Sequence, residues 1–287
     1  MTGNRHDNPL NRLPFGPIAV SLVLVLTGAA YLALRPSRPN DLGAAFFRRP
    51  PRGTVRVVTW NIGRDRGGPK TSLEGSVVDA VADALNRLHA DVICLQAVES
   101  EECSESIAAA LDGEWSHATI RDGTAATHHM TVLVRRSMQP IQRRLLDTRA
   151  DRSSIVYDVQ VSDRGVGRFT CADASGMDGP WRHKYFADLN TWVGEHPAAL
   201  TVLAGSFGTE SSGDSGVGRS TDSRTLDLLR RAWIECGPAG VATTRNRGQA
   251  DRVFAMPKTV SVARAAVVTG AAIAGVEHLP IVVDIVP

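Results

Sequence analysis

The sequence lacks a strong net charge and has no dense block of lysine or arginine. Its 287 residues include 32 basic and 30 acidic side chains, which gives a formal net charge of +2. Proteins that grip the phosphate backbone of nucleic acids carry clustered basic side chains, because each phosphate contact needs a cation. The charge pattern therefore gives no support to a nucleic-acid partner, and we expect none.

Cysteine is also scarce, and its spacing is not that of a metal site. None of the four cysteines forms a CxxC pair, and two of them fall inside apolar strand-like runs. We expect buried free thiols, which fix no cellular compartment, at Cys94, Cys103, Cys171 and Cys236.

One long apolar run stands near the N-terminus. Residues 18–34 (IAVSLVLVLTGAAYLAL) contain no charged side chain, and these 17 residues are at the short limit for a helix that crosses the roughly 30 Å hydrocarbon core of a bilayer. We expect a single-pass transmembrane helix here, preceded by an N-terminal tail at 1–17. The alternatives are a cleaved signal peptide, with Gly28-Ala29-Ala30 as the cleavage region, and a buried helix.

The basic residues on either side of this run give conflicting signals about orientation. Two arginines precede it and five come closely after it, so a count of positive charges favours a cytoplasmic domain. A short N-terminal tail before an apolar segment instead favours export of the downstream domain. The side of the membrane stays open, and we favour the extracytoplasmic one.

The rest of the chain divides into a linker and a domain. Residues 35–53 contain four prolines and several arginines without periodicity, which predicts an extended tether. The globular domain is expected at 54–287. Its opening alternates a strand-like VRVVT at 55–59, an amphipathic helix at 77–88 and a strand-like DVICLQ at 91–96. Further strands are expected at 131–134, 155–161, 200–204, 252–256, 260–268 and 281–286, and a helix at 226–233.

Five short motifs follow one another in this domain: TWNI at 59–62, ADVICLQA at 90–97, LAGSFG at 203–208, DRVF at 251–254 and EHLPI at 277–281. In that order they resemble the endonuclease/exonuclease/phosphatase superfamily, which includes deoxyribonuclease I-like nucleases and inositol-polyphosphate 5-phosphatases. The resemblance covers about 54–287. It implies an α/β fold, a four-layer sandwich of two mixed β-sheets flanked by helices, here preceded by the N-terminal transmembrane helix.

Several chemical positions of that superfamily carry other residues in this chain. The family site uses Mg²⁺ or Mn²⁺ to stabilise charge on a phosphoryl group and a carboxylate to activate water. By this resemblance Ala97 stands in place of the metal-binding glutamate, Ser206 in place of the water-activating aspartate and Gly208 in place of the phosphate-binding asparagine. Asp173 comes nearest to the place of a family histidine. A methyl group cannot coordinate a cation, and a serine hydroxyl is a far weaker base than a carboxylate.

Other positions match the family pattern. Asn61 corresponds to the asparagine near the metal or phosphate, Asp251 to the aspartate that orients the last histidine, and His278 to that histidine, which donates to a phosphate oxygen. We expect these three residues to meet Ala97, Ser206 and Glu277 at one end of the sheet pair, because the motifs place all six at strand ends. Glu277 replaces the neighbouring aspartate, and it and Glu99, otherwise expected in a solvated acidic loop, are the candidate metal ligands.

Three functional hypotheses are consistent with these residues. The first is a membrane-anchored, catalytically impaired domain, a pseudoenzyme that binds a phosphate-bearing ligand or a protein partner and requires no metal, or binds Mg²⁺ or Mn²⁺ weakly. The alternative is an active Mg²⁺-dependent phosphodiesterase or phosphatase with a metal site rebuilt from Glu99, Asp173, Glu277 or an acid of the 205–220 loop. The third is a structural envelope protein. We favour the first, because the metal ligand, the base and a phosphate donor are all replaced.

Overall fold

The computed structural model describes residues 45–63, 75–121, 128–148, 150, 152–161, 165–209, 217–238, 240–244 and 249–287. All of them belong to one compact unit, Leu42–Pro287. The predicted tail at 1–17, the predicted membrane segment at 18–34 and the first part of the predicted linker, 35–44, lie outside the described residues.

The domain is built on two six-stranded sheets, each of mixed parallel and antiparallel strands. The order in the first sheet is β11 (Ser261–Val267), β12 (Ile281–Val286), β1 (Val55–Asn61), β2 (Val92–Val98), β4 (His129–Arg135) and β3 (Trp115–Arg121). The order in the second is β5 (Pro140–Thr148), β6 (Arg152–Gln160), β7 (Val166–Asp173), β8 (Leu200–Ser206), β10 (Asp251–Met256) and β9 (Ile234–Glu235).

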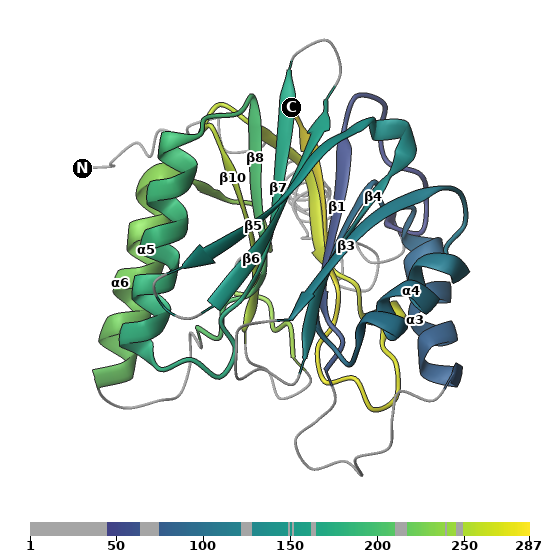
Figure 1. The fold of residues 1–287 in the computed structure, drawn as a ribbon, viewed down its shortest axis with the longest axis horizontal. Helices are drawn as coiled ribbons and strands as arrows, with labels where there is room; N and C mark the ends of the chain where they lie inside the picture. Colours follow the sequence, from purple (N-terminus) through teal and green to yellow (C-terminus); the bar gives the residue numbers. More distant parts are fainter. Residues whose placement is uncertain are drawn as a thin grey trace, which may run out of the picture. The chain divides into compact units, whose positions relative to one another are not determined.

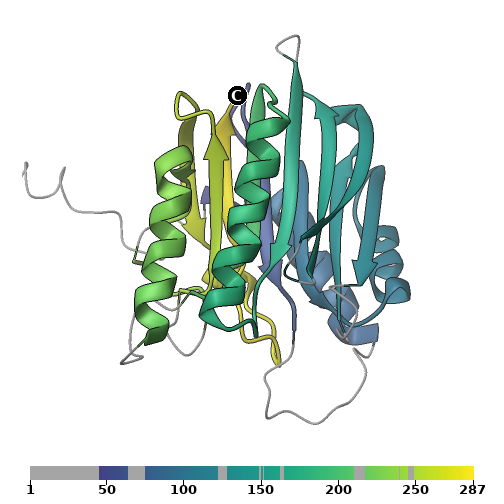
Figure 2. The ribbon, with the colours of Figure 1, turned by 60° about the vertical axis from the view of Figure 1, so that its left-hand side comes forward.

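Helices cover the outer face of each sheet, as Figures 1 and 2 show. The helices α3 (Gly75–Leu88) and α4 (Glu101–Ala110) pack on the first sheet, and α5 (Gly179–Glu195) and α6 (Val217–Ala232) pack on the second. Three apolar clusters result, one between the sheets and one under each helix pair. This arrangement confirms the predicted α/β sandwich of two mixed sheets.

Elements that the sequence did not predict include α4, β3 and β5. The acidic stretch expected as a loop instead begins α4, because the Ser100 side chain accepts the Cys103 N–H and caps the helix. Glu101 and Glu102 lie in the first turn, where negative charge favours a helix. Helix α6 begins at Val217, inside the loop expected at 205–220.

The described part of the predicted linker, residues 45–53, differs from an extended tether. Phe46 is 1% exposed and belongs to the apolar cluster under α3 and α4. The Arg56 guanidinium donates to the carbonyl oxygens of Phe46 and Arg48. The domain therefore begins upstream of the predicted boundary at 54. The buried Phe46 ring and the hydrogen bonds from the Arg56 side chain to backbone carbonyls hold this segment in place.

Among the helices in the described part of the chain, none has both the length and the apolar character needed to span a bilayer.

A buried ion pair joins the first strand of the domain to its last. Arg56 on β1 lies opposite Asp284 on β12, and both side chains are 0% exposed. Arg56 Nε donates to Asp284 Oδ1 at 2.6 Å and Nη2 donates to Oδ2 at 3.0 Å. Its Nη1 also donates to the carbonyl oxygen of Leu88 at the end of α3. Each of the three guanidinium nitrogens thus has a hydrogen-bond acceptor, which a buried charge requires.

We predict that Asp284→Asn lowers the free energy of unfolding by roughly 3–5 kcal/mol, because it leaves the buried Arg56 charge uncompensated. Arg230→Gln is the matched control: it removes an arginine that pairs with Glu235 but is 49% exposed, so it should cost less than about 1 kcal/mol. Urea denaturation of the chain measures both. Equal losses in the two variants would show that burial does not set the strength of the Arg56–Asp284 pair.

Candidate functional site

Polar residues occupy the inter-sheet faces of neighbouring strands at one end of the sandwich. Alternate residues of a strand share a face, so Asn61 continues the face of Val57, and Ser206 continues that of Ala204. Val57 and Ala204 belong to the apolar cluster between the sheets. The same alternation places Asp173, Asp251 and Gln96 on this surface. The strands therefore change from apolar to polar at the same end.

Ser206 lies at the centre of this group. Its neighbours in register are Asp173 on β7 and Asp251 on β10. Across the sandwich, Asn61 Nδ2 donates to Ser206 Oγ at 3.3 Å. Ser206 is 0% exposed. The second sheet thus presents carboxyl, hydroxyl and carboxyl groups in a row.

Asp251 and His278 form the ion pair that the sequence predicted as a unit. His278 Nδ1 lies 2.6 Å from Asp251 Oδ2. Asp251 is 1% exposed, whereas the His278 side chain keeps 14% of its surface accessible. With Nδ1 donating to the carboxylate, Nε2 is the nitrogen available to a ligand. Asp251 Oδ1 is buried, and no hydrogen bond from the described residues reaches it.

Two residues that the sequence analysis did not assign to the site support this pair. The hydroxyl of Thr243 accepts the backbone N–H of Asp251 at 3.1 Å, and its carbonyl oxygen accepts the N–H of Leu279 at 2.7 Å. Trp60 Nε1 donates to the backbone oxygen of His278 at 3.0 Å. Trp60 was visible in the TWNI motif, but Thr243 stands in no motif and carried no sequence signal.

The charges around His278 favour its protonated form. Burial by itself lowers the pKa of His278, but the hydrogen bond to Asp251 and the negative charges of Asp251, Glu277 and Asp173 outweigh it and raise the pKa above the ordinary 6.5. Burial also raises the pKa of the Asp173 carboxyl; hydrogen bonds from Ser175 and the charge of Arg152 oppose the shift, and the charge of Asp251 adds to it. The acidic groups around His278 therefore stabilise its imidazolium form.

Ala97 lies beside Asn61 on the opposite sheet from Ser206. A Cβ placed on Gly63 would approach Ala97 Cβ to 2.7 Å and Asn61 Oδ1 to 3.0 Å. Gly63, Ala97 and Asn61 are therefore close neighbours. Ala97 has a φ of 52° next to a register shift between β2 and β4. Bulges of this kind re-aim a side chain, and a left-handed backbone at a non-glycine residue is a mark of functional sites. Here the re-aimed side chain is only a methyl group.

Three further candidate residues are Gly208, Glu277 and Glu99. Gly208 comes two residues after Ser206 and has a φ of 60°, a conformation that asparagine tolerates. Glu277 is half-buried and acts on His278 through its charge. Glu99 is exposed, and it lies close enough to Cys103 to affect the pKa of that thiol.

The described donor residues do not form the ligand set of the divalent metal that the family resemblance implies. Mg²⁺ and Mn²⁺ take several oxygen ligands, usually carboxylates. In the described portion of the chain, no group of three or more His, Cys, Asp or Glu side chains is arranged to hold a metal ion. The structure does not bring the two candidate ligands Glu277 and Glu99 into such a group.

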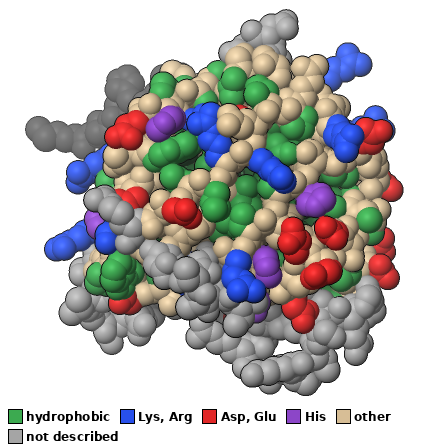
Figure 3. All heavy atoms as spheres, viewed as in Figure 1, with side chains coloured by type: hydrophobic (Ala, Val, Ile, Leu, Met, Phe, Trp, Pro, Cys, Tyr) green, Lys and Arg blue, Asp and Glu red, His purple; other side chains and the backbone are tan. Residues whose placement is uncertain are grey.

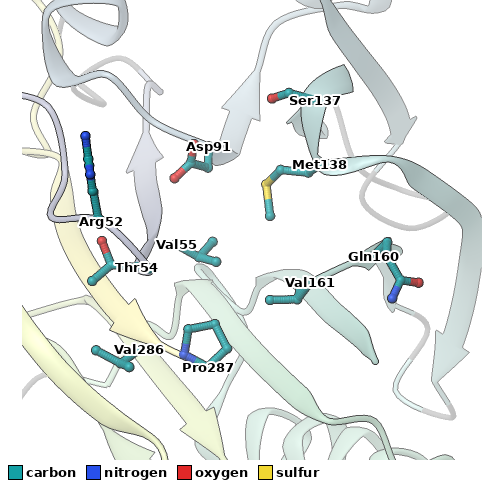
Figure 4. A pocket seen from close by; sticks show the side chains of 11 residues that line it. Arg52, Thr54, Val55, Asp91, Ser137, Met138, Gln160, Val161, Val286 and Pro287 are labelled. Atoms are coloured by element: carbon teal, nitrogen blue, oxygen red, sulfur yellow. The ribbon is translucent and has the colours of Figure 1, made fainter. Parts of the chain in front are cut away.

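A cavity of about 560 Å³ lies at the opposite end of the same strands. Val55 and Val286 in its wall stand at the far ends of β1 and β12 from the site, and Figure 4 shows Asp91 and Met138 on the Val55 side of the same wall. The cavity is therefore separate from the group around Ser206.

The sequence matches no protein-family model and no curated protein. The structure, however, is similar to solved members of the endonuclease/exonuclease/phosphatase family. A family protein from Leptotrichia buccalis matches with a TM-score of 0.60 at 14% identity, over 80% of this chain and 99% of that one. The human Nocturnin catalytic domain with bound sulfate matches with a TM-score of 0.61 at 13% identity, over 82% and 95%. A mannosyl-6-phosphatase from Bacteroides thetaiotaomicron matches with a TM-score of 0.60 at 13% identity, over 81% and 100%. The chain has the fold of this superfamily, as the motifs predicted.

We predict that Asp251→Asn lowers the pKa of His278, because it removes the largest of the stabilising negative charges. Since the folded pKa is raised, the stabilisation from this pair is fully present below about pH 6.5 and is lost as pH rises through the folded pKa. NMR titration of the imidazole and urea denaturation at several pH values measure the two effects. An unchanged titration of His278 in the Asp251→Asn variant would contradict this account of the pair.

We also predict that Ser206→Asp destabilises the domain by roughly 3–5 kcal/mol at neutral pH, because it buries a third carboxylate between Asp173 and Asp251. Its folded pKa would be raised, so the penalty should disappear as pH falls towards the unfolded value of about 3.9. Ser206→Ala, which removes only a long hydrogen bond, should cost about 1 kcal/mol. Adding Asp173→His to Ser206→Asp should restore much of the loss; denaturation curves that show no recovery would argue against charge crowding.

Proposed function

We propose that this domain is a catalytically impaired member of the superfamily that binds a phosphate-bearing ligand at the His278 site, while residues 18–34 anchor it in a membrane. The observation that carries the proposal is the contrast within one row of residues. The Asp251–His278 pair is intact at 2.6 Å, whereas the position beside it, Ser206, carries a hydroxyl in place of a carboxylate.

The pair supports recognition of an oxyanion. A protonated imidazole held by a buried carboxylate offers Nε2 as a charge-assisted donor, and such hydrogen bonds contribute about 1.5–3 kcal/mol. The Nocturnin domain that shares this fold was solved with a sulfate anion bound, and sulfate has the same tetrahedral oxyanion geometry as phosphate. A small phosphate ester suits the site better than nucleic acid, because the chain carries a net charge of only +2 and Figure 3 shows basic and acidic side chains intermixed.

The same residues give little support to efficient hydrolysis. Water activation needs a base whose pKa lies near the working pH, and a serine hydroxyl without an activating partner is not one. The only described side-chain partner of Ser206 Oγ is the Asn61 amide, which donates to it. Asp173 lies next to Ser206; burial raises the pKa of its carboxyl group, and the charge of Asp251 adds to the shift.

Binding can be tested by calorimetric titration of the whole chain with inorganic phosphate and with phenyl phosphate. We expect His278→Gln to weaken binding about tenfold to a hundredfold, the equivalent of one charge-assisted hydrogen bond. Binding by the unmodified chain should also weaken as pH rises through the raised pKa of His278. His117→Gln, on the edge strand β3, is the control and should bind as the unmodified chain does. Equal binding by both variants would remove His278 from the site.

Catalysis is tested separately with nitrophenyl phosphate monoesters and diesters in Mg²⁺ or Mn²⁺. We expect the unmodified chain to act barely above background. A variant combining Ala97→Glu, Asp173→His, Ser206→Asp and Gly208→Asn restores four of the replaced family residues. It should gain metal-dependent activity that His278→Ala abolishes. Turnover by the unmodified chain that is lost in Asp173→Ala or Glu99→Ala would instead establish the rebuilt metal site.

A further inference from the structure

Strand β5 forms an open edge of the second sheet and exposes apolar side chains along it. It is nine residues long and, among the described residues, pairs with β6 alone. Ile141 and Leu145 on this strand are each 54% exposed, and they are two of the four large apolar side chains exposed in the described structure. An edge with these properties is a template for pairing with another strand. The opposite edge, β9, has only two residues.

The exposed face of β5 extends the surface that elsewhere forms the core between the sheets. Arg143 and Leu145 lie opposite Tyr157 and Ile155 in register, and these two β6 residues belong to the inter-sheet cluster. Apolar side chains appear in the middle of the face in Figure 3, over the β5 and β6 strands of Figure 1. The other face of β5 is occupied, because Leu146 packs against the cluster under α5 and α6.

The sequence of this face is complementary to itself. Arg143 and Asp147 stand two residues to either side of Leu145, and all three side chains are exposed. If two copies of β5 pair antiparallel about Leu145, each Arg143 lies opposite an Asp147 and the two Leu145 side chains meet. Opposite charges and apolar side chains placed directly across an antiparallel pair are both stabilising. A two-fold axis makes every such contact occur twice.

Other registers lack this match. Centred on Arg144, the pairing would place Arg143 against Leu145 and Ile141 against Asp147. In the register centred on Leu145, Arg144 needs no partner from the other copy, since it donates to Gln142 Oε1 at 2.8 Å and lies 3.8 Å from Asp158 within its own chain.

We propose that β5 is a homodimer interface, in which two copies of this chain pair antiparallel edge to edge about a two-fold axis at Leu145. The second sheets of the two copies then join into one continuous sheet. This arrangement covers Leu145 with its own copy and removes the open edge.

Disulfide trapping tests the position of the axis in the full-length chain, kept in mild detergent so that the apolar N-terminal run causes no association. Leu145→Cys should give a disulfide-linked dimer under mild oxidation, because Leu145 meets its own copy. Ile141→Cys, equally exposed at 54%, should not, because its copies would stand about 27 Å apart along the paired strands. The four native cysteines are buried and do not interfere. Trapping through Ile141→Cys but not Leu145→Cys would overturn the register.

Charge reversal tests the pairing itself, with the mass measured by light scattering across a range of concentrations. Arg143→Asp or Asp147→Arg alone should weaken the dimer tenfold or more, because each places like charges together at two symmetric positions. The double variant should recover dimerisation, since it exchanges the partners of the same pairs. A monomeric unmodified chain, or a double variant no better than the single ones, would overturn the proposal. Association through the N-terminal run would leave all four chains alike and would also overturn it.

Discussion

The buried pair of Arg56 and Asp284 is the interaction on which the rest of the domain depends. It fixes β12 against β1 and also holds the upstream segment through Phe46 and Arg48. Such a pair is not a large net source of stability, because desolvation offsets most of the attraction. Its effect is on specificity: any other register of β12 would leave a charge buried without its partner.

That register has a consequence at the far end of the same strands. With Thr59 opposite Ile281, the residues just before β12 lie beside the end of β1. Trp60 therefore reaches the backbone of His278, and His278 reaches Asp251 on the other sheet. A structural constraint at one end of the sandwich thus positions the imidazole at the other.

The site is best understood as a rearrangement of charge. Three neighbouring strands present Asp173, Ser206 and Asp251 in a row. A carboxylate at each of the three positions would crowd like charges in a buried place. An aspartate at 173 is therefore compatible with a neutral residue, such as serine, at 206. The neutral Ser206 hydroxyl between the two carboxyl groups limits the negative charge that is buried beside Asp173.

The motifs determined much of this protein from the sequence alone. They predicted the two mixed sheets with flanking helices and the meeting of Asn61, Ser206, Asp251 and His278. The apolar surroundings of the four cysteines predicted their burial. These predictions were possible because the alternation of strand side chains is local, and it tells which residues at a strand end share a face.

Contacts between distant segments were decided only by the tertiary structure. No local pattern shows that Phe46 inserts beneath α3 and α4, that Thr243 supports Asp251, or that Asp173 stands beside Ser206. The self-complementary face of β5 was also hidden, because its mixture of arginine, leucine and aspartate has meaning only once the strand is known to be an open edge. These features depend on which strands are neighbours, and packing over the whole domain decides that.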